Sequence, residues 1–419
     1  MRLLCTADLH LGRRSSLPDE CRDGRRHACA EAWLACVELA RREQVAAVLL
    51  AGDLIDQENQ RYEARGPFET GLRRLAEAGI SALAVAGNHD GAALGQVFDL
   101  FDPGLCRLVG RGGHWERVVL TRDGERLAID GFSFARREQA TSPLASYDLP
   151  PAEGPVLGLV HADLDARGSA CGPVTLAELR ARPVAGWVLG HVHRPRLLAE
   201  AAPGVLYPGS PQALDAGETG AHGPWLASVS PGGAVAWEQV PLSSVRYETV
   251  TVDLDGVEAE AVAEGRVHDA LRAALGEVAP TGPAWLVCRL RLVGRTPLHR
   301  RAEALLAPAV LNAELPRQGE TRAVVERVES ATRPAWDLAA RGAGHDPVAV
   351  LARLLLDVES GAGDADLLAA AGERLATVHA ASVVAPVREP APAPDAARAG
   401  LLAQGYRLLD ALLGQGEGR

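Results

Sequence analysis

The chain has 419 residues, of which 47% are hydrophobic, and its formal net charge at pH 7 is −11. This length allows two or three domains that each bury a core. The longest apolar runs fall short of a membrane span and no targeting segment opens the chain, so we expect a cytoplasmic protein that contacts no membrane. The seven cysteines are odd in number and scattered without a C-x-x-C pair, which argues against a disulfide framework and a thiolate zinc site.

The first half of the sequence repeats one pattern, in which an apolar run is followed by a polar turn and then by a stretch with helical spacing. Trp33 lies on the apolar face of the first predicted helix, and Phe68 lies on that of the second. Pro67 fits the first turn of this second helix, and Gly79 fits its end. The pattern predicts an α/β fold with right-handed crossovers. Its buried strands are expected at 3–7, 45–51, 80–86, 156–160 and 186–189.

From Val245 onward the pattern changes to that of a second, smaller α/β region. In its middle strand, Cys288 and Leu290 alternate with Arg289 and Arg291, so we expect one face of this strand to be wet. The predicted elements are a strand at 247–254, a helix at 258–275, a strand at 285–293, a helix at 297–312 and a strand at 321–328.

Beyond Pro334 the sequence shows only helical patterns, interrupted by a segment rich in proline and alanine that is typical of a stiff linker. The last helix carries an apolar stripe that includes Leu402, Tyr406, Leu409 and Leu413. This stripe needs a surface to bury against, either on its own chain or on another chain. We therefore divide the sequence into regions at 1–245, 246–332 and 333–383, a linker at 384–395 and a C-terminal helix at 396–419.

Each of the five predicted strands in the first region ends in residues that coordinate metals in proteins. The runs finish as TADLHLG, AGDLIDQ, AGNHD, LVHADL and LGHVHRP. Taken singly, each motif is more typical of a capped turn or a helix cap. In an open α/β sheet, however, ligands bind outside the carboxyl ends of the strands, so we expect the five turns to converge. Together they predict a metal site formed by Asp8, His10, Asp53, Asn88, His161, His191 and His193.

The predicted donors are imidazoles, carboxylates and one amide, with no thiolate. This set favours ions such as Mn²⁺, Fe²⁺ or Zn²⁺, and the excess of donors over four indicates two divalent ions. Asp53 is the carboxylate that we choose as the bridge between them. We assign His89 as the general acid that protonates a leaving oxygen, with Asp90 orienting its imidazole.

The series D-x-H, G-D, G-N-H-D, H and G-H-x-H, in that order, resembles the calcineurin-like metallophosphoesterase superfamily over about the first 215 residues. The resemblance implies a fold of two β-sheets flanked by helices. It also implies that one metal ion is held by Asp8, His10, Asp53 and His193, and the other by Asp53, Asn88, His161 and His191.

Within that superfamily, the stretches TADLHLGRR, GDLIDQEN and YPGSPQALDAGETGAHG resemble the DNA-repair nucleases called SbcD in bacteria and meiotic recombination eleven in eukaryotes. The YhaO-like bacterial branch is the most similar. This resemblance implies a small α/β capping domain after the phosphoesterase domain, followed by helices that bind a coiled-coil ABC-type ATPase of the SbcC kind. It implies DNA as the substrate and leaves a homodimer open.

Many members of that family carry a histidine three residues after the bridging aspartate, where this chain has Asp56. Asp56 is therefore a candidate for contacts with the substrate, together with Arg13 and Arg14. Other arginines are either further phosphate contacts or ordinary solvated residues; these are Arg22, Arg25, Arg26, Arg289 and Arg291.

The function expected from the sequence is that of a Mn²⁺-dependent DNA exonuclease or endonuclease, which acts in DNA repair by a two-metal mechanism. One alternative is a phosphodiesterase or phosphatase of the same fold that acts on a nucleotide, a lipid or a phosphoprotein. Another is a subunit that binds DNA or an ATPase with little catalysis. The long extension after the first region favours the nuclease, and the full set of donors argues against the binding subunit.

Overall fold

The computed structural model describes the chain except for residues 22–26, 57–60, 103, 167, 201, 315, 362–364, 382–393 and 415–419. The chain divides into two compact units. The first comprises Met1–Glu248, Ala274–Cys288 and Leu315–Glu326, and the second comprises Thr249–Ala273, Arg289–Glu314 and Arg327–Arg419. None of the described helices combines the length and the hydropathy that a membrane span requires.

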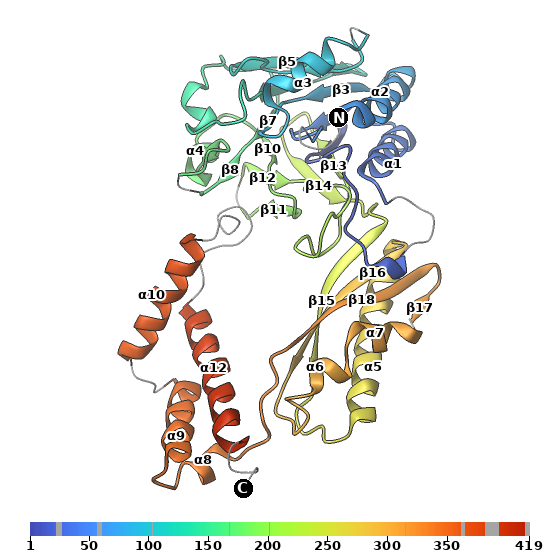
Figure 1. Ribbon diagram of the computed structural model, residues 1–419. Helices are drawn as coiled ribbons and strands as arrows, with labels where there is room; N and C mark the ends of the chain where they lie inside the picture. The colour runs from blue at the N-terminus through green and yellow to red at the C-terminus, as the bar shows by residue number, and fades with distance from the viewer. Residues whose placement is uncertain are drawn as a thin grey trace. The chain divides into compact units, whose positions relative to one another are not determined.

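Two six-stranded sheets form most of the first unit (Figure 1). One sheet has the strand order β14 (Val235–Gln239), β13 (Trp225–Val229), β1 (Arg2–Thr6), β2 (Ala47–Leu50), β3 (Ser81–Ala84) and β4 (Arg107–Leu108). The other has the order β11 (Arg196–Leu198), β12 (Gly204–Tyr207), β10 (Gly186–Gly190), β7 (Val156–His161), β6 (Glu125–Phe132) and β5 (Trp115–Arg122). Three short elements complete the set: β8 (Asp163–Leu164), β9 (Pro173–Val174) and helix α4 (Leu176–Arg180).

The strands of the first sheet are buried on both faces. In β1, Leu4 packs against the helices, whereas Leu3 and Cys5 pack between the two sheets. In β2, Val48 and Leu49 divide in the same way. A strand that is buried on both faces has an unbroken apolar sequence, and for this reason the sequence predicted these strands well. The expected fold of two sheets flanked by helices is confirmed.

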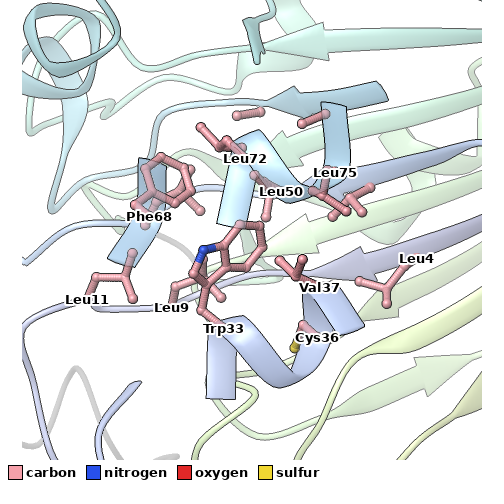
Figure 2. Packing of buried hydrophobic residues seen from close by; sticks show 14 of the residues in the cluster. Leu4, Leu9, Leu11, Trp33, Cys36, Val37, Leu50, Phe68, Leu72 and Leu75 are labelled. Carbon is pink, nitrogen blue, oxygen red and sulfur yellow. The ribbon is translucent and has the colours of Figure 1, made fainter. Parts of the chain in front are cut away.

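Helices α1 (Cys29–Arg42), α2 (Arg61–Glu77) and α3 (Gly91–Phe98) cover the outer face of the first sheet (Figure 1). Trp33 of α1 and Phe68 of α2 meet in this core, with ring centroids 5.5 Å apart (Figure 2). The predicted start of α2 is wrong, because Pro67 lies inside the helix and not in its first turn. Proline removes one helical hydrogen bond, and the burial of Phe68 and Leu72 outweighs that loss.

The strands that end in the polar turns pair in parallel. Leu4 of β1 lies opposite Val48 of β2, which in turn lies opposite Ala82 of β3. In the second sheet, Gly190 of β10 lies opposite His161 of β7. Parallel strands bring their carboxyl ends to the same edge of a sheet. All five of the predicted strands are present, and each of the five polar turns follows the carboxyl end of its strand.

A four-stranded sheet has the order β15 (Val245–Asp253), β16 (Trp285–Val293), β18 (Thr321–Ser330) and β17 (Arg317–Gln318), and helix α5 (Glu260–Val278) connects β15 to β16. The single helix predicted at 297–312 is wrong: the chain forms two short helices, α6 (Ala302–Leu305) and α7 (Pro308–Leu311). Pro308 has no amide hydrogen to continue the first helix, and it occupies the first turn of the second.

The last helices of the second unit are α8 (Leu338–Arg341), α9 (Pro347–Ser360), α10 (Ala365–Ala381) and α12 (Pro394–Gly414). Leu402, Tyr406 and Leu409 of α12 are buried and share a core with Ala352 and Leu355 of α9. The apolar stripe of the last helix is therefore buried on its own chain. Helix α12 begins inside the predicted linker at 384–395, most of which lies outside the described residues.

A polar network accompanies this packing. Glu359 of α9 accepts hydrogen bonds from Arg295, from Arg333 and from the Tyr406 hydroxyl of α12. The guanidinium groups of Arg295 and Arg333 also lie 5.6 and 5.3 Å from the centre of the Tyr406 ring. One tyrosine therefore connects α12 both to α9 and to the residues that follow β16 and β18.

Two glycines allow a close approach among the turns at the carboxyl ends of the strands. A Cβ atom at Gly190 would lie 1.9 Å from the carbonyl oxygen of Ala51 and 2.6 Å from Nδ1 of His161. At Gly87 it would lie 2.3 Å from Oδ1 of Asp53 and 2.7 Å from Nδ1 of His161. A methyl group at either position would push apart segments that follow strands of different sheets.

The substitution Gly190→Ala is expected to lower the free energy of unfolding by about 1–3 kcal/mol, because the added methyl group overpacks a buried contact with backbone. Urea unfolding of the full chain measures this. Gly265→Ala in α5 is the matched control, since a Cβ there meets nothing within 4 Å; this change should raise stability by about 0.5–1 kcal/mol. Equal midpoints for Gly190→Ala and the unaltered protein would contradict the close approach.

Candidate metal centre

Three predicted ligands come together from the first and last of the five turns. Ligand atoms of Asp8, His10 and His193 all lie within 4.8 Å of one another. The Nε2 atoms of His10 and His193 face each other at 2.9 Å. The carboxylate of Asp8 accepts the backbone N–H of His191 at 3.0 Å, which fixes the turn that carries His193.

The other four predicted ligands adjoin this group. Ligand atoms of Asp53, His161 and Asp8 lie within 4.8 Å of one another, so Asp8 belongs to both groups. Oδ1 of Asn88 lies 2.9 Å from Nε2 of His161 and 3.2 Å from Nδ1 of His191. The structure thus brings all seven predicted ligands into one buried or half-buried cluster.

The backbone at this cluster is unusual. Asp8, His10, Asp53 and His191 have φ angles of 51°, 42°, 52° and 102°, in the left-handed region that non-glycine residues rarely adopt. Hydrogen bonds hold the first two, because the N–H groups of Asp8 and His10 donate to the carbonyls of Gly52 and Asp53, each at 3.0 Å. Such conformations cost about 1–3 kcal/mol each and concentrate at functional sites.

Burial governs the ionisation of the cluster. Desolvation raises the pKa of Asp8 to about 7 and lowers the pKa of His161 to about 4. Burial also disfavours the charged form of Asp53, but the neighbouring imidazoles, His161 first, outweigh it and bring the pKa of Asp53 to about 2. For His193, burial is outweighed by the hydrogen bond to Glu218 and by Asp8, which raise its pKa to about 9.

The residues fit a pair of divalent cations. The donors are oxygen and imidazole nitrogen, a mixture that suits Mn²⁺, Fe²⁺ or Zn²⁺. Among the described residues, Nδ1 of His10 is a buried atom without a hydrogen-bond partner, so the only polar contact of this ring is at Nε2, toward His193. Two buried carboxylates, Asp8 and Asp53, also face one site, and positive charge would offset their repulsion.

His89 lies at the edge of the cluster. Its side chain is 30% exposed, and its ring centroid is 4.9 Å from that of His10. Asp90 does not orient it as predicted, because the two carboxylate oxygens of Asp90 accept the backbone N–H groups of Gly87 and Leu54 at 2.8 and 2.6 Å. Asp90 therefore fastens the turn to the neighbouring one, and burial together with Asp53 raises its pKa to about 8.

The carboxylate that faces His89 is that of Asp56, with Oδ1 3.9 Å from Nδ1 of His89. Its other oxygen lies 3.6 Å from Nε of Arg13. Asp56 is only 4% exposed, so the expectation that it contacts a substrate is revised: it supports Arg13 and His89 from behind. Arg14 is exposed, and Arg22, Arg25 and Arg26 lie outside the described residues.

Sequence reasoning missed two acidic residues beside the ligands. Oε1 of Glu218 lies 2.6 Å from Nδ1 of His193, and Oδ2 of Asp163 lies 3.5 Å from Nε2 of His191. Asp163 stands two residues after a predicted ligand, which was a usable signal. Glu218 is distant in sequence from every ligand, and only its place in the YPGSPQALDAGETGAHG stretch pointed to it.

Comparisons with known proteins agree with this geometry. Residues 1–195 match the calcineurin-like phosphoesterase family, and residues 247–333 match the middle domain of the metallophosphoesterase YhaO. The chain is 31% identical over 222 residues to the uncharacterized metallophosphoesterase YhaO of Bacillus subtilis, a match that covers 52% of this chain and 53% of that protein.

Two further relatives have names that refer to a nuclease or to DNA. One is the SbcD component of the nuclease SbcCD of Escherichia coli, 31% identical over 31% of each protein. The other is the DNA double-strand break repair protein Mre11 of Methanopyrus kandleri, 28% identical over 61% of this chain and 60% of that protein. The chain thus spans from about a third to three fifths of the length of these relatives.

Addition of Mn²⁺ is expected to stabilise the metal-free protein more at pH 8 than at pH 6. The folded protein keeps a proton on Asp8 up to about pH 7, whereas the unfolded chain releases it near pH 3.8. Without metal, this difference makes stability fall as the pH rises between these values, and bound cations would remove the penalty. They must also displace a proton from His193, whose pKa is raised to about 9.

Thermal melting with and without Mn²⁺ at both pH values measures this. At a concentration of about 100 times Kd the midpoint should rise by roughly 5 °C or more at pH 8. In Asp53→Asn the gain should vanish at both pH values. A larger gain at pH 6 than at pH 8 would refute the argument.

The five motifs, the two groups of donor atoms and the match over residues 1–195 all lead to the same assignment. The first part of this chain is a calcineurin-like metallophosphoesterase domain, in the branch that includes the YhaO, SbcD and Mre11 proteins.

Proposed function

We propose that this protein is a Mn²⁺-dependent DNA nuclease that hydrolyses phosphodiester bonds in DNA repair. The observation that carries the proposal is the pair of donor groups, which share Asp8 and lie beside the partly exposed His89. A pair of cations offset by two carboxylates suits a substrate with a negatively charged phosphoryl group. The names of two relatives support DNA as the substrate.

The residues that would hold one cation are Asp8, His10, Asp53 and His193, and those for the other are Asp53, Asn88, His161 and His191. When bound, the two cations would supply Lewis-acid chemistry and neutralise phosphoryl oxygens. The chain itself fixes the ligands: the N–H of His89 donates to Oδ1 of Asp53 at 2.9 Å, and Nδ1 of His161 faces the Ala51 carbonyl at 3.0 Å.

The proton for the leaving oxygen would come from His89. Its ring is accessible, and Asp56 stands on the side of Nδ1, which leaves Nε2 free to face a substrate. Arg13 and Arg14 follow His10 directly and would bind phosphates of the DNA backbone. The net charge of −11 makes such local arginines necessary, because the protein as a whole repels DNA.

The second match extends the proposal to the rest of the chain. Residues 247–333 resemble a YhaO middle domain, and we propose that the region at 246–332 is the capping domain and that 1–245 is the nuclease domain. One relative is named as part of SbcCD, so a second, SbcC-like ATPase is the proposed partner. Val350 and Leu354 of α9 and Leu408 of α12 are exposed apolar side chains that could receive it.

The nuclease activity is tested with the purified chain, Mn²⁺ and labelled linear duplex DNA, beside bis(p-nitrophenyl) phosphate as a generic diester. His89→Ala is expected to lower turnover on DNA by roughly 10²–10⁴-fold, the usual contribution of a general acid. Binding of Mn²⁺ should stay unchanged, because the His89 side chain is not among the donors. His114→Ala, which removes an exposed imidazole elsewhere, is the matched control.

The same assay decides between the functions. Cleavage of the small diester with intact DNA would favour a phosphodiesterase of another substrate class. Binding of DNA without cleavage of either substrate would favour a subunit without catalysis. Loss of Mn²⁺ in His89→Ala would show that this residue is a ligand and would refute its role as the acid.

Arg14→Gln is expected to weaken the binding of DNA of any sequence. Each phosphate contact contributes about 0.9 to the slope of log affinity against log salt concentration, so the slope should fall by about that amount. Fluorescence anisotropy across a salt series measures it, with Arg42→Gln on α1 as the control because the Arg42 side chain is 67% exposed. An unchanged slope for Arg14→Gln would mean that Arg14 faces solvent only.

A further inference from the structure

The two histidines of the LGHVH turn are supported by two different carboxylates. Glu218 faces Nδ1 of His193 at 2.6 Å, and Asp163 faces Nε2 of His191 at 3.5 Å. In each ring the other nitrogen points to the predicted ligands: Nε2 of His193 faces His10 at 2.9 Å, and Nδ1 of His191 faces Asn88 at 3.2 Å. The carboxylates therefore contact the histidines from opposite ends of the ring.

Glu218 is held by several bonds. Its Oε1 atom accepts from His193, while Oε2 accepts from the Ser210 hydroxyl at 3.0 Å and from the backbone N–H of Leu214 at 2.8 Å. The residue is only 8% exposed. A carboxylate fixed at both oxygens can hold an imidazole in one orientation and one tautomer, with the proton on the nitrogen that it faces.

The segment around Glu218 is anchored to β15. Thr219 forms a bridge with Tyr247, and the N–H of Gly220 donates to the carbonyl of Tyr247 at 3.2 Å. The Tyr247 hydroxyl is buried and donates to the carbonyl of Ser16, in the loop that follows the His10 turn. One tyrosine thus contacts both the strand segment next to Glu218 and the loop beyond His10.

Asp163 is held less firmly. It belongs to the short strand β8, its side chain is 23% exposed, and its 3.5 Å contact with His191 is longer than that of Glu218 with His193. Because a longer and wetter contact is weaker, Asp163 should orient its histidine less strongly than Glu218 does.

We propose that Glu218 and Asp163 are separate positioning residues, Glu218 for the Asp8, His10 and His193 group and Asp163 for the Asn88 and His191 group. The proposal rests on the proposed two-metal function and adds that each cation depends on its own carboxylate. Loss of such a supporting carboxylate typically lowers metal affinity by about 10–100-fold. Removing one carboxylate should therefore weaken one cation and leave the other in place.

The test is a Mn²⁺ titration of the metal-free full chain, in which electron paramagnetic resonance counts free and bound ions. The unaltered protein should bind two Mn²⁺. Glu218→Gln should lower the affinity for one of them by about tenfold or more, and Asp163→Asn should lower the affinity for one by less. Glu200→Gln, an exposed acid in the same unit, is the control and should bind like the unaltered protein.

A double-mutant cycle assigns each carboxylate to its histidine. Glu218→Gln should cause no further loss in a His193→Ala background but should keep its full effect in a His191→Ala background. Asp163→Asn should show the reverse. Equal losses in both backgrounds would overturn the assignment, because they would indicate a general electrostatic or structural effect.

Glu218→Asp separates position from charge. It keeps the negative charge but withdraws the oxygen from Nδ1 of His193, so a positioning role predicts reduced affinity, whereas a charge effect predicts unaltered affinity. Thermal melting without metal shows whether each variant folds, and Glu218→Asp serves if Glu218→Gln does not. If the unaltered protein binds no Mn²⁺, the proposed function fails; if it binds two and Glu218→Gln binds both as tightly, only this inference fails.

Discussion

The architecture depends on one constraint, which is that uncompensated negative charge and several imidazoles are buried together where strands of two sheets end. Asp8 and Asp53 are each about 1% exposed, and His10 and His161 are fully buried. Such a group is costly to assemble without positive charge. The left-handed backbone at four ligands and the glycines that precede Asp53, Asn88 and His191 make sense only if the ligand atoms must converge.

The elements that the sequence predicted correctly are those in which local pattern and burial agree. Strands buried on both faces have continuous apolar sequences, and the polar turns after them are short, so the convergence of Asp8, Asn88 and His193 followed from the order of strands. Prediction failed where tertiary contacts decide. Pro67 lies inside α2, and Asp90 turns away from the adjacent His89 to bind the backbone of Leu54, which no spacing rule indicates.

The supporting shell was the least predictable part of the site. Glu218 reaches His193 across the fold, and Asp56 stands where related sequences carry a histidine. Neither interaction has a periodicity, because each joins segments that only the folded chain brings together. The metal ligands themselves are recognisable from motifs, whereas the groups that orient them depend on loops between the strands, and these loops are where members of one fold differ in substrate.

The contact of α12 with α9 determines how the end of the chain can be altered. Leu402, Tyr406 and Leu409 shield an apolar face of α9 that would otherwise meet water, and the Tyr406 hydroxyl shares Glu359 with two arginines. A protein that stops before Pro394 would therefore expose both an oily groove and an unsatisfied acid, and we would expect it to self-associate. The final helix is an integral wall of its unit, and tags or fusions are better placed after it than in exchange for it.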